Sequence, residues 1–303
     1  MSDLSTAEPV EAVELANGIY RSMPAATYHE IDRCSNSRLN DLNPPARLRY
    51  KLDNPAAPAC PITLRDPLEF GGLLHTLVLD RVPWQDRRLP YEKMPPFKTE
   101  RGGTSFKERD AWMAECGNHG VAPVHADAWD AAAMMAENIN RNTKARALIK
   151  GAADFEQSVL FDDRWYGEAC KMRADIVCPM YRVGVDLKTT EDASRNGFQR
   201  SISRYGYHRQ AAFYLHGLAI AGISLDYFAF IVVEKSPPYA VAVYQLSHEA
   251  IQQGEEELRP LISRYQRCRH EGRWPDYQSD GEQGIETIDL PPWHYSQWEN
   301  GAA

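Results

Sequence analysis

Apolar and polar residues alternate through three successive segments in the middle of the chain. The segments are "DFEQSVLF", "GEACKMRADIV" and "YRVGVDLKTT", and the turn-like stretches "DDRWYG" and "CPMY" separate them. Alternation with a period of two is typical of β-strands that place one face in a core. In the second segment the predicted apolar face consists of Cys170, Met172, Ala174, Ile176 and Cys178. Arg173 and Asp175 are then expected on the opposite face.

The third segment carries an acid and a base on its polar face. Val183, Val185 and Leu187 share the apolar face, whereas Asp186 and Lys188 share the other one. Strands joined by a short turn usually pair antiparallel. The polar faces of the second and third strands can then coincide, which would bring the acid of the second strand close to Asp186 and Lys188.

Longer periodic segments predict helices on both sides of these strands. Before them, "DPLEFGGLLHTLVLD", residues 105–117 and the long "DAWDAAAMMAENINRNTKARALI" have helical patterns, and a short helix capped by Ser35 or Ser37 precedes Pro44-Pro45. After them come a helix at 195–221, the strands "LDYFAFIVVE" and "YAVAVYQL", and a final helix, "SHEAIQQGEEELRPLISRYQRCRHEG". Residues 81–103 lack a period and predict an irregular surface loop. This order predicts an α/β fold with a central mixed β-sheet flanked by helices, plus a helical N-terminal part.

The same pattern divides the 303 residues into four regions. We expect a flexible acidic tail at 1–16, a mainly helical N-terminal part at 17–150, a catalytic core at 151–272 and a C-terminal tail at 273–303. A chain of this length can bury a core without disulfides or structural metals.

Charge and cysteine content narrow the class of protein. The net charge of −8 disfavours a protein that coats nucleic acid by bulk electrostatics, although it allows an enzyme with a local basic lining. The six cysteines have neither the spacing nor the histidine partners of a zinc or iron–sulfur site. The first residues lack a long apolar core, and no apolar run approaches the length of a membrane span. We therefore expect a reduced, cytoplasmic setting without membrane contact.

The expected proximity of Asp175, Asp186 and Lys188 suggests a metal site. Two adjacent carboxylates repel each other, and a hard cation such as Mg²⁺ relieves this repulsion while leaving room for a substrate phosphate. The lysine could then orient or deprotonate a water molecule. An acid and a lysine two residues apart are by themselves more typical of a solvated face or an ion pair. The second acid on the neighbouring strand makes the two interpretations comparable.

Several motifs together resemble the PD-(D/E)XK nuclease superfamily. Asp175 followed by Asp186-Leu187-Lys188 resembles its split catalytic signature, although Ala174 replaces the proline of the name. Gln210 and Tyr214 have the Q-x-x-x-Y spacing of the RecB-like branch, and "GGLLH", ending at His75, resembles its G-x-x-x-H element. The segment "SNSRLNDL" resembles the start of RecE-type (exonuclease VIII-like) phage and prophage exonucleases. The iron–sulfur cysteines of the helicase-linked relatives have no counterpart.

The resemblance implies roles for individual residues. Asp175, Asp186 and the backbone carbonyl of Leu187 would bind metal, His75 would coordinate or flank a second ion, and Lys188 would position the attacking water. Gln210 and Tyr214 would hold the DNA backbone or the active-site network. Two Mg²⁺ ions about 4 Å apart, which Mn²⁺ could replace, would stabilise the attacking and leaving oxygens.

Some of these positions have simpler alternatives. His75 and Tyr214 could be core residues, and Gln210 could be a solvated helix residue. Ser37 could hold a 5′ phosphate or only cap a helix. Arg204 and Arg209 could contact phosphates or only solubilise a helix face. Glu156 stands where some relatives carry an additional acid, but it could also be an ordinary charged residue at a strand start.

The resemblance implies a magnesium-dependent exodeoxyribonuclease that degrades linear double-stranded DNA from 5′ to 3′. Its product would be a 3′ single strand for recombination, handed to a RecT-like annealing protein. Relatives form rings around DNA, so a homo-oligomeric ring is expected. The alternatives are an endonuclease of the same superfamily and a catalytically inactive DNA-binding protein with this fold.

Overall fold

The computed structural model describes most of the chain. The described residues are 15–54, 61–80, 85, 89–98, 105–164, 167–277, 285, 287–291 and 294. Residues 1–14 of the predicted acidic tail and most of the predicted C-terminal tail lie outside these ranges. The four-region division therefore stays a prediction.

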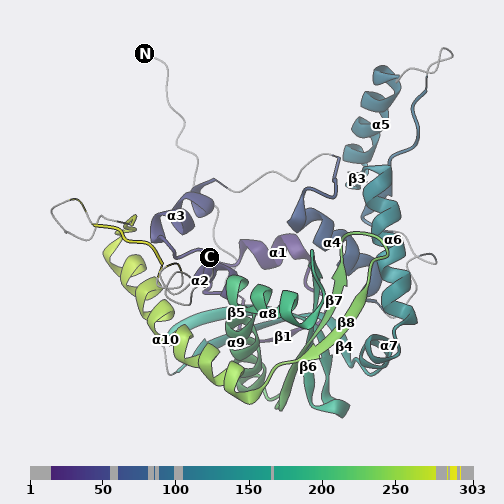
Figure 1. Ribbon diagram of the computed structural model, residues 1–303. Helices are drawn as coiled ribbons and strands as arrows, with labels where there is room; N and C mark the ends of the chain where they lie inside the picture. The colour runs from purple at the N-terminus through teal and green to yellow at the C-terminus, as the bar shows by residue number, and fades with distance from the viewer. Residues whose placement is uncertain are drawn as a thin grey trace, which may run out of the picture.

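A six-stranded mixed sheet forms the centre of the molecule (Figure 1). Its order is β1-β4-β5-β6-β7-β8, from β1 (Gly18–Tyr20), β4 (Asp154–Asp163), β5 (Glu168–Cys178), β6 (Val183–Thr190), β7 (Tyr227–Glu234) and β8 (Val241–Gln245). Only β6 and β7 pair in parallel within this sheet. The crossover between them contains α8 (Arg195–Tyr205) and α9 (Tyr207–Ile220). The predicted mixed α/β architecture and the antiparallel pairing of β5 with β6 are confirmed.

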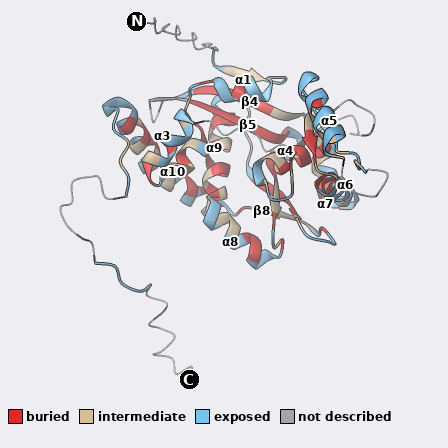
Figure 2. Ribbon diagram, turned by 90° about the horizontal axis from the view of Figure 1, so that it is seen from above, coloured by how far each residue is buried: buried red, intermediate tan, exposed pale blue. Residues whose placement is uncertain are grey.

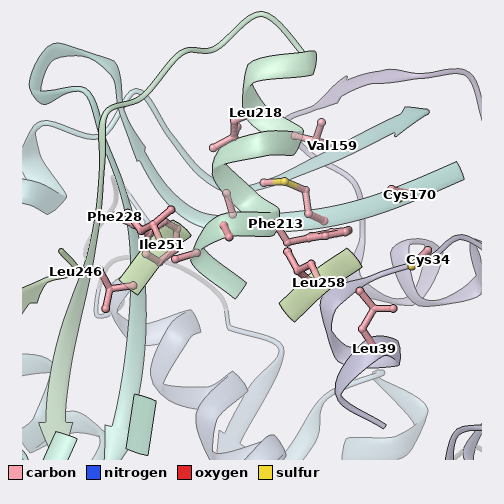
Figure 3. Packing of buried hydrophobic residues seen from close by; sticks show 14 of the residues in the cluster. Cys34, Leu39, Val159, Cys170, Phe213, Leu218, Phe228, Leu246, Ile251 and Leu258 are labelled. Atoms are coloured by element: carbon pink, nitrogen blue, oxygen red, sulfur yellow. The ribbon is translucent and has the colours of Figure 1, made fainter. Parts of the chain in front are cut away.

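Helices cover both faces of the sheet, so both faces are buried (Figures 1 and 2). The first core lies between the sheet and α2 (Asn36–Asn40), α3 (Pro45–Asp53), α9 and α10 (His248–Glu271). Figure 3 shows Phe213 and Leu218 of α9 packed in this core with Val159 of β4 and Leu258 of α10. The second core lies under α4 (Pro67–Val78), α6 (Ala126–Arg141) and α7 (Thr143–Lys150).

The remaining elements lie at the periphery. They are α1 (Ala25–Glu30), a 3₁₀ turn (Pro179–Tyr181), α5 (Phe106–Asn118), and the strands β2 (Tyr91–Lys93) and β3 (Ala122–Val124), which form a separate parallel pair. Strand β2 lies within the stretch predicted to be an irregular loop. That prediction is wrong there because pairing with β3 supplies an order that no local period signals. Residues 81–84, 86–88 and 99–103 of the loop lie outside the described residues.

The prediction of one apolar face along β5 is also wrong. Cys170, Met172 and Ala174 pack in the first core, whereas Ile176 and Cys178 pack in the second. The alternation therefore changes phase at Asp175. Opposite this position, Glu156 of β4 has a φ of 49° and falls between the ladder pairs Phe155–Ile176 and Gln157–Ala174. Because both sheet faces are buried, apolar residues suit either face, and the sequence cannot reveal the change.

Two predicted long helices are each broken in two. Asn142 separates α6 from α7, and its side chain accepts hydrogen bonds from the N–H groups of Lys144 and Ala145, both at 3.1 Å. Gly206 separates α8 from α9 with a left-handed φ of 66°. Ser35 caps α2, as one of the two predicted alternatives, by accepting from Arg38 N–H at 3.4 Å.

The five cysteines among the described residues, Cys34, Cys116, Cys170, Cys178 and Cys268, are buried and form no disulfide with one another. Within the same part of the chain, every helix is too short or too polar to cross a membrane.

Candidate active site

The candidate site forms where β5 and β6 separate. Their last backbone pair is Ile176 with Val185, so Asp175 and Asp186 occupy the next position on each strand. The Leu187 N–H donates to Asp175 Oδ2 at 2.8 Å, so this carboxylate takes up the N–H where the strand ladder ends. Both aspartates are buried, with 7% and 2% of their surfaces exposed. The structure thus brings the two predicted acids together.

Lys188 lies beside Asp186. Its Nζ is 2.6 Å from Asp186 Oδ2 and 4.8 Å from the centre of the Tyr207 ring. Burial by itself would lower the pKa of Lys188, but the carboxylates of Asp186 and Asp175 outweigh it and raise the pKa. Lys188 is therefore a fixed cation, which suits positioning a water molecule better than removing a proton from it.

The helix α9 contributes two predicted residues. The amide of Gln210 donates to Asp186 Oδ1 at 2.5 Å, whereas Lys188 Nζ lies closest to Oδ2 of the same carboxylate. Tyr214, one turn later, contacts Phe228 edge-on with ring centres 6.2 Å apart. Burial raises the pKa of Tyr214 well above its usual value, and the nearby carboxylates add to this, while a hydrogen bond with the Gln210 side chain opposes it. Tyr214 is thus both a packing residue and a neighbour of the acidic centre.

His75 reaches the same centre from α4. Its Nε2 lies 3.0 Å from the Leu187 carbonyl oxygen and 3.7 Å from Asp175 Oδ2, and its Nδ1 lies 3.2 Å from Glu156 Oε1. Burial would lower the pKa of His75, but Asp175 and Glu156 outweigh it and raise the pKa to about 9. His75 thus contacts a backbone carbonyl, as a core histidine would, and also lies between two carboxylates.

Two glycines precede His75 on the same helix. Gly71 and Gly72 lie inside α4, and both line the cleft that leads to the site. A Cβ atom at Gly71 would meet no atom within 4 Å, so Gly71 leaves open space one helical turn before His75.

Glu156 belongs to this cluster, although the sequence alone left it open between an additional acid and a charged strand residue. Its left-handed backbone, with a φ of 49°, is unusual for a non-glycine residue and is typical of functional sites. It directs the carboxylate to His75. The available sequence signal was an acid within the predicted strand segment "DFEQSVLF".

The residues present fit a divalent cation. One ligand atom each from His75, Glu156 and Asp175 lie within 4.8 Å of one another, and the Asp186 carboxylate and Leu187 carbonyl are adjacent. Burial, and next the charge of Asp186, raise the pKa of Asp175 to about 7. A cation would remove this conflict between like charges. A donor set dominated by oxygen suits Mg²⁺ or Mn²⁺.

The predicted phosphate-binding residues separate into two groups. Arg204 is exposed and lines the cleft that leads to Lys188. Arg209 instead donates to Glu257 Oε2 at 2.8 Å and to Asn40 Oδ1 at 3.1 Å, so it ties α9 to α10 and α2. Ser37 bonds with Ser35 at 3.0 Å and is not part of the cleft wall.

A cleft of about 830 Å³ connects the site to solvent. It lies between α4 and α8, and the end of β6 forms its floor. Three aromatic lining residues from α8 and α9 and one lysine directly after β7 were not predicted as site residues. They are Tyr205, Tyr207, Phe198 and Lys235, and Arg200 of α8 also lines the cleft.

Comparisons with known proteins agree with the fold. No curated protein matches the sequence. The crystal structure of a "Putative exonuclease" from Eubacterium rectale is similar in fold, with a TM-score of 0.58 and 12% identity over 91% of this chain and 98% of that chain. A phage related exonuclease from Haemophilus somnus 129PT matches only partly, with a TM-score of 0.26 and 15% identity over 34% of this chain and 58% of that chain.

The family comparison covers the site itself. A profile described as a PDDEXK-like domain of unknown function, DUF3799, matches residues 64–285. This range contains His75, Glu156, Asp175, Asp186 and Lys188. The chain therefore belongs to this family of PDDEXK-like domains.

Proposed function

We propose that the protein is a divalent-metal-dependent exodeoxyribonuclease that degrades one strand of linear duplex DNA from its 5′ end. The observation that carries the proposal is the meeting of Asp175, Asp186 and Lys188 at the point where β5 and β6 separate. Membership in a PDDEXK-like family supports hydrolysis of nucleic acid. The fold similarity to a protein described as an exonuclease agrees with it.

Each residue of the site would have a separate role in hydrolysis. Asp175, Asp186 and the Leu187 carbonyl would hold the metal, with His75 and Glu156 beside them. A bound Mg²⁺ would supply Lewis-acid stabilisation of charge on the phosphate oxygens. Lys188, held by Asp186, would orient the attacking water and attract the phosphate. Gln210 would keep the Asp186 carboxylate aimed at the centre.

The substrate form, the product and the assembly rest on the resemblance of the motifs to RecE-type exonucleases. The proposal includes a 3′ single-stranded product for a RecT-like annealing protein and a homo-oligomeric ring around the DNA. A ring would hold a protein of net charge −8 on DNA without strong electrostatic affinity. Analytical ultracentrifugation of the full chain would test the ring, because a monomer at all concentrations would contradict it.

The decisive experiment compares linear and circular DNA. The substrates are a duplex labelled at one 5′ end, the same duplex labelled at a 3′ end, and a covalently closed circle, each with Mg²⁺. We expect digestion of linear DNA from the 5′ end and an intact circle. Asp186→Asn and Lys188→Met should each lower the rate about a thousandfold, which corresponds to several kcal/mol of transition-state stabilisation.

Two matched controls report effects of charge removal alone. Asp127→Asn and Lys144→Met change exposed residues outside the cleft, and their rates should equal that of the unaltered protein. Cleavage of the circle would favour the endonuclease alternative. Absence of cleavage, together with no metal binding in calorimetric titration, would favour the inactive DNA-binding alternative. Normal rates in both site variants would overturn the catalytic assignment.

A further inference from the structure

A single residue joins α8 to α9 and sets two tyrosines side by side. Gly206 has a φ of 66°, and a Cβ atom there would collide with the Arg209 guanidinium. Glycine therefore permits a turn too tight for other residues. Tyr205 and Tyr207 flank it, with ring centres 5.6 Å apart and planes inclined by 29°, which is a stacked arrangement.

The inner tyrosine is fixed between the core and the catalytic lysine. The Tyr207 ring lies 6.0 Å from that of Phe198 and 5.7 Å from that of Phe230. Its face is 4.8 Å from Lys188 Nζ. The position of Tyr207 is thus determined by packing, and it connects the acidic centre to the cleft.

The outer tyrosine is exposed. Half of the surface of Tyr205 is accessible, and its ring lies in the cleft wall. The Arg204 guanidinium is 5.5 Å from the ring centre. Arg200, one helical turn earlier, also lines the cleft and remains 73% exposed at its side chain despite an ion pair with Asp192 at 3.2 Å. Tyr205 therefore presents a half-exposed aromatic ring beside two cations, one of which, Arg204, lies over the ring.

A stacked aromatic face beside cations in a cleft is what an unpaired nucleic-acid strand binds. Bases stack on aromatic rings largely independently of sequence, and cations follow the phosphates. Inside a duplex, each base face is covered by its neighbours, so an internal base pair cannot use Tyr205. The tyrosine pair begins at Lys188, so a base stacked on it would lie close to the bond to be cut.

We propose that Tyr205, supported by Tyr207, is a stacking platform for an unpaired base of the strand in the active site. Arg200 and Arg204 bind the phosphates that follow it. The site therefore receives DNA as a locally single strand, separated from its complement before hydrolysis. This inference rests on the proposed function and specifies the form of substrate that enters the cleft.

The test measures binding of a fluorescent single-stranded oligonucleotide to the full chain, with Ca²⁺ in place of Mg²⁺ to prevent cleavage. Loss of the ring in Tyr205→Ala should weaken binding about five- to a hundredfold, as expected for one stacked base. Tyr205→Phe keeps the ring and should bind like the unaltered protein. Tyr50→Ala removes a more exposed tyrosine, 68% against 50%, that lies outside the cleft; this control variant should also bind normally.

An abasic series identifies the stacked base. Removing the base at one position of the oligonucleotide should weaken binding to the unaltered protein by a similar factor and have little effect on Tyr205→Ala. Equal binding by Tyr205→Ala and the unaltered protein would overturn the platform, as would equal sensitivity of both proteins to every abasic position. Both results would stand even if the unaltered protein cleaves DNA normally.

Failure of the nuclease proposal has a different signature. If the unaltered protein cleaves no DNA substrate with Mg²⁺ but binds the strand in a Tyr205-dependent manner, the catalytic assignment fails and the platform is supported. If it cleaves linear DNA with the same rate and half-saturating DNA concentration as Tyr205→Ala, only the platform fails.

Discussion

Asp175 and Leu187 are joined by a hydrogen bond across the gap where β5 and β6 separate, with 2.8 Å between the carboxylate oxygen and the backbone nitrogen. This contact places the first acid of the signature against the segment that contains the second acid and the lysine. The strands need not remain paired for the two acids to meet. The Asp175 carboxylate accepts from the Leu187 N–H directly after the last backbone pair of the two strands.

The stability of the metal-free protein should depend on the charge of Asp175. Burial and Asp186 raise the pKa of this carboxyl to about 7, above its value in an unfolded chain. Its ionisation therefore opposes folding: the penalty is absent below about pH 4, grows between pH 4 and 7, and is constant above. Asp175→Asn should thus increase the free energy of unfolding at pH 8 by on the order of 1–3 kcal/mol.

Denaturant unfolding at pH 5.5 and pH 8, with a chelator present, checks this prediction. The gain from Asp175→Asn should be smaller at pH 5.5 than at pH 8. Addition of Mg²⁺ should stabilise the unaltered protein more than Asp175→Asn. A variant that is less stable than the unaltered protein at pH 8 would contradict the proposed conflict of charges.

Substitutions of Glu156 should separate its effect on stability from its effect on activity. Its left-handed backbone is unfavourable for any residue with a Cβ atom by about 1–2 kcal/mol. Glu156→Gly should therefore be more stable than Glu156→Ala by about that amount, while both lose the carboxylate beside His75 and cleave DNA at least tenfold more slowly. Thermal unfolding and the end-label assay measure the two effects. Equal stability of the two variants would argue against backbone strain at this position.

Gln210 should act by positioning Asp186. Because its amide donates to the carboxylate at 2.5 Å, Gln210→Ala should raise the Mg²⁺ concentration at half-maximal cleavage by about 10- to 100-fold. Gln210→Glu places a like charge at the same distance and should be more severe. The readout is a metal titration of activity at saturating DNA. A lower maximal rate with unchanged metal dependence would mean that Gln210 acts on the substrate instead.

Lys171 should be a structural residue despite its charge. Its buried ammonium donates to the carbonyls of Tyr28 and Ile31, both at 2.7 Å, and of His29 at 3.3 Å. Lys171→Met leaves these carbonyls without their donor and should cost about 2–4 kcal/mol of unfolding free energy. Lys51→Met, which removes an exposed ion pair with Asp41, should cost less than about 1 kcal/mol. Similar losses in both variants would refute a special role for Lys171.

The two adjacent glycines of α4 should respond differently to alanine. A Cβ at Gly71 meets nothing within 4 Å, so Gly71→Ala should gain the full helix preference of about 0.5–1 kcal/mol. A Cβ at Gly72 would lie 3.1 Å from the Tyr91 hydroxyl, so Gly72→Ala should gain less. Thermal unfolding of the two variants measures the two gains in stability. A larger gain at Gly72 would contradict the packing described for α4.

Local patterns in the sequence were sufficient to predict which segments around the site are strands and which are helices. The alternation in "YRVGVDLKTT" placed Asp186 and Lys188 on one face of β6, and the short connection to β5 implied antiparallel pairing. The four-residue spacing of Gln210 and Tyr214 followed from the helical repeat. These features depend on neighbours within a few residues, which a sequence displays directly.

Two predicted long helices show where prediction from such local patterns fails. The segments 127–149 and 195–221 keep a helical period across Asn142 and Gly206. Each is nevertheless broken, because a side-chain cap at Asn142 and a left-handed turn at Gly206 outweigh continuation of the helix. Short strands such as β2 lack any period and exist only through their partner.

The sequence by itself determined which acids, base and amide are available to a metal site and on which elements they lie, because periodicity and spacing are local. Only the tertiary structure decided that the Glu156 carboxylate contacts His75, that Arg209 donates a hydrogen bond to Glu257, and that Tyr205 lines the cleft. These outcomes depend on strand register, on the phase change at Asp175 and on helix packing. Those are contacts between segments far apart in the chain, and their energies are decided only when the whole sheet and both helical layers are assembled.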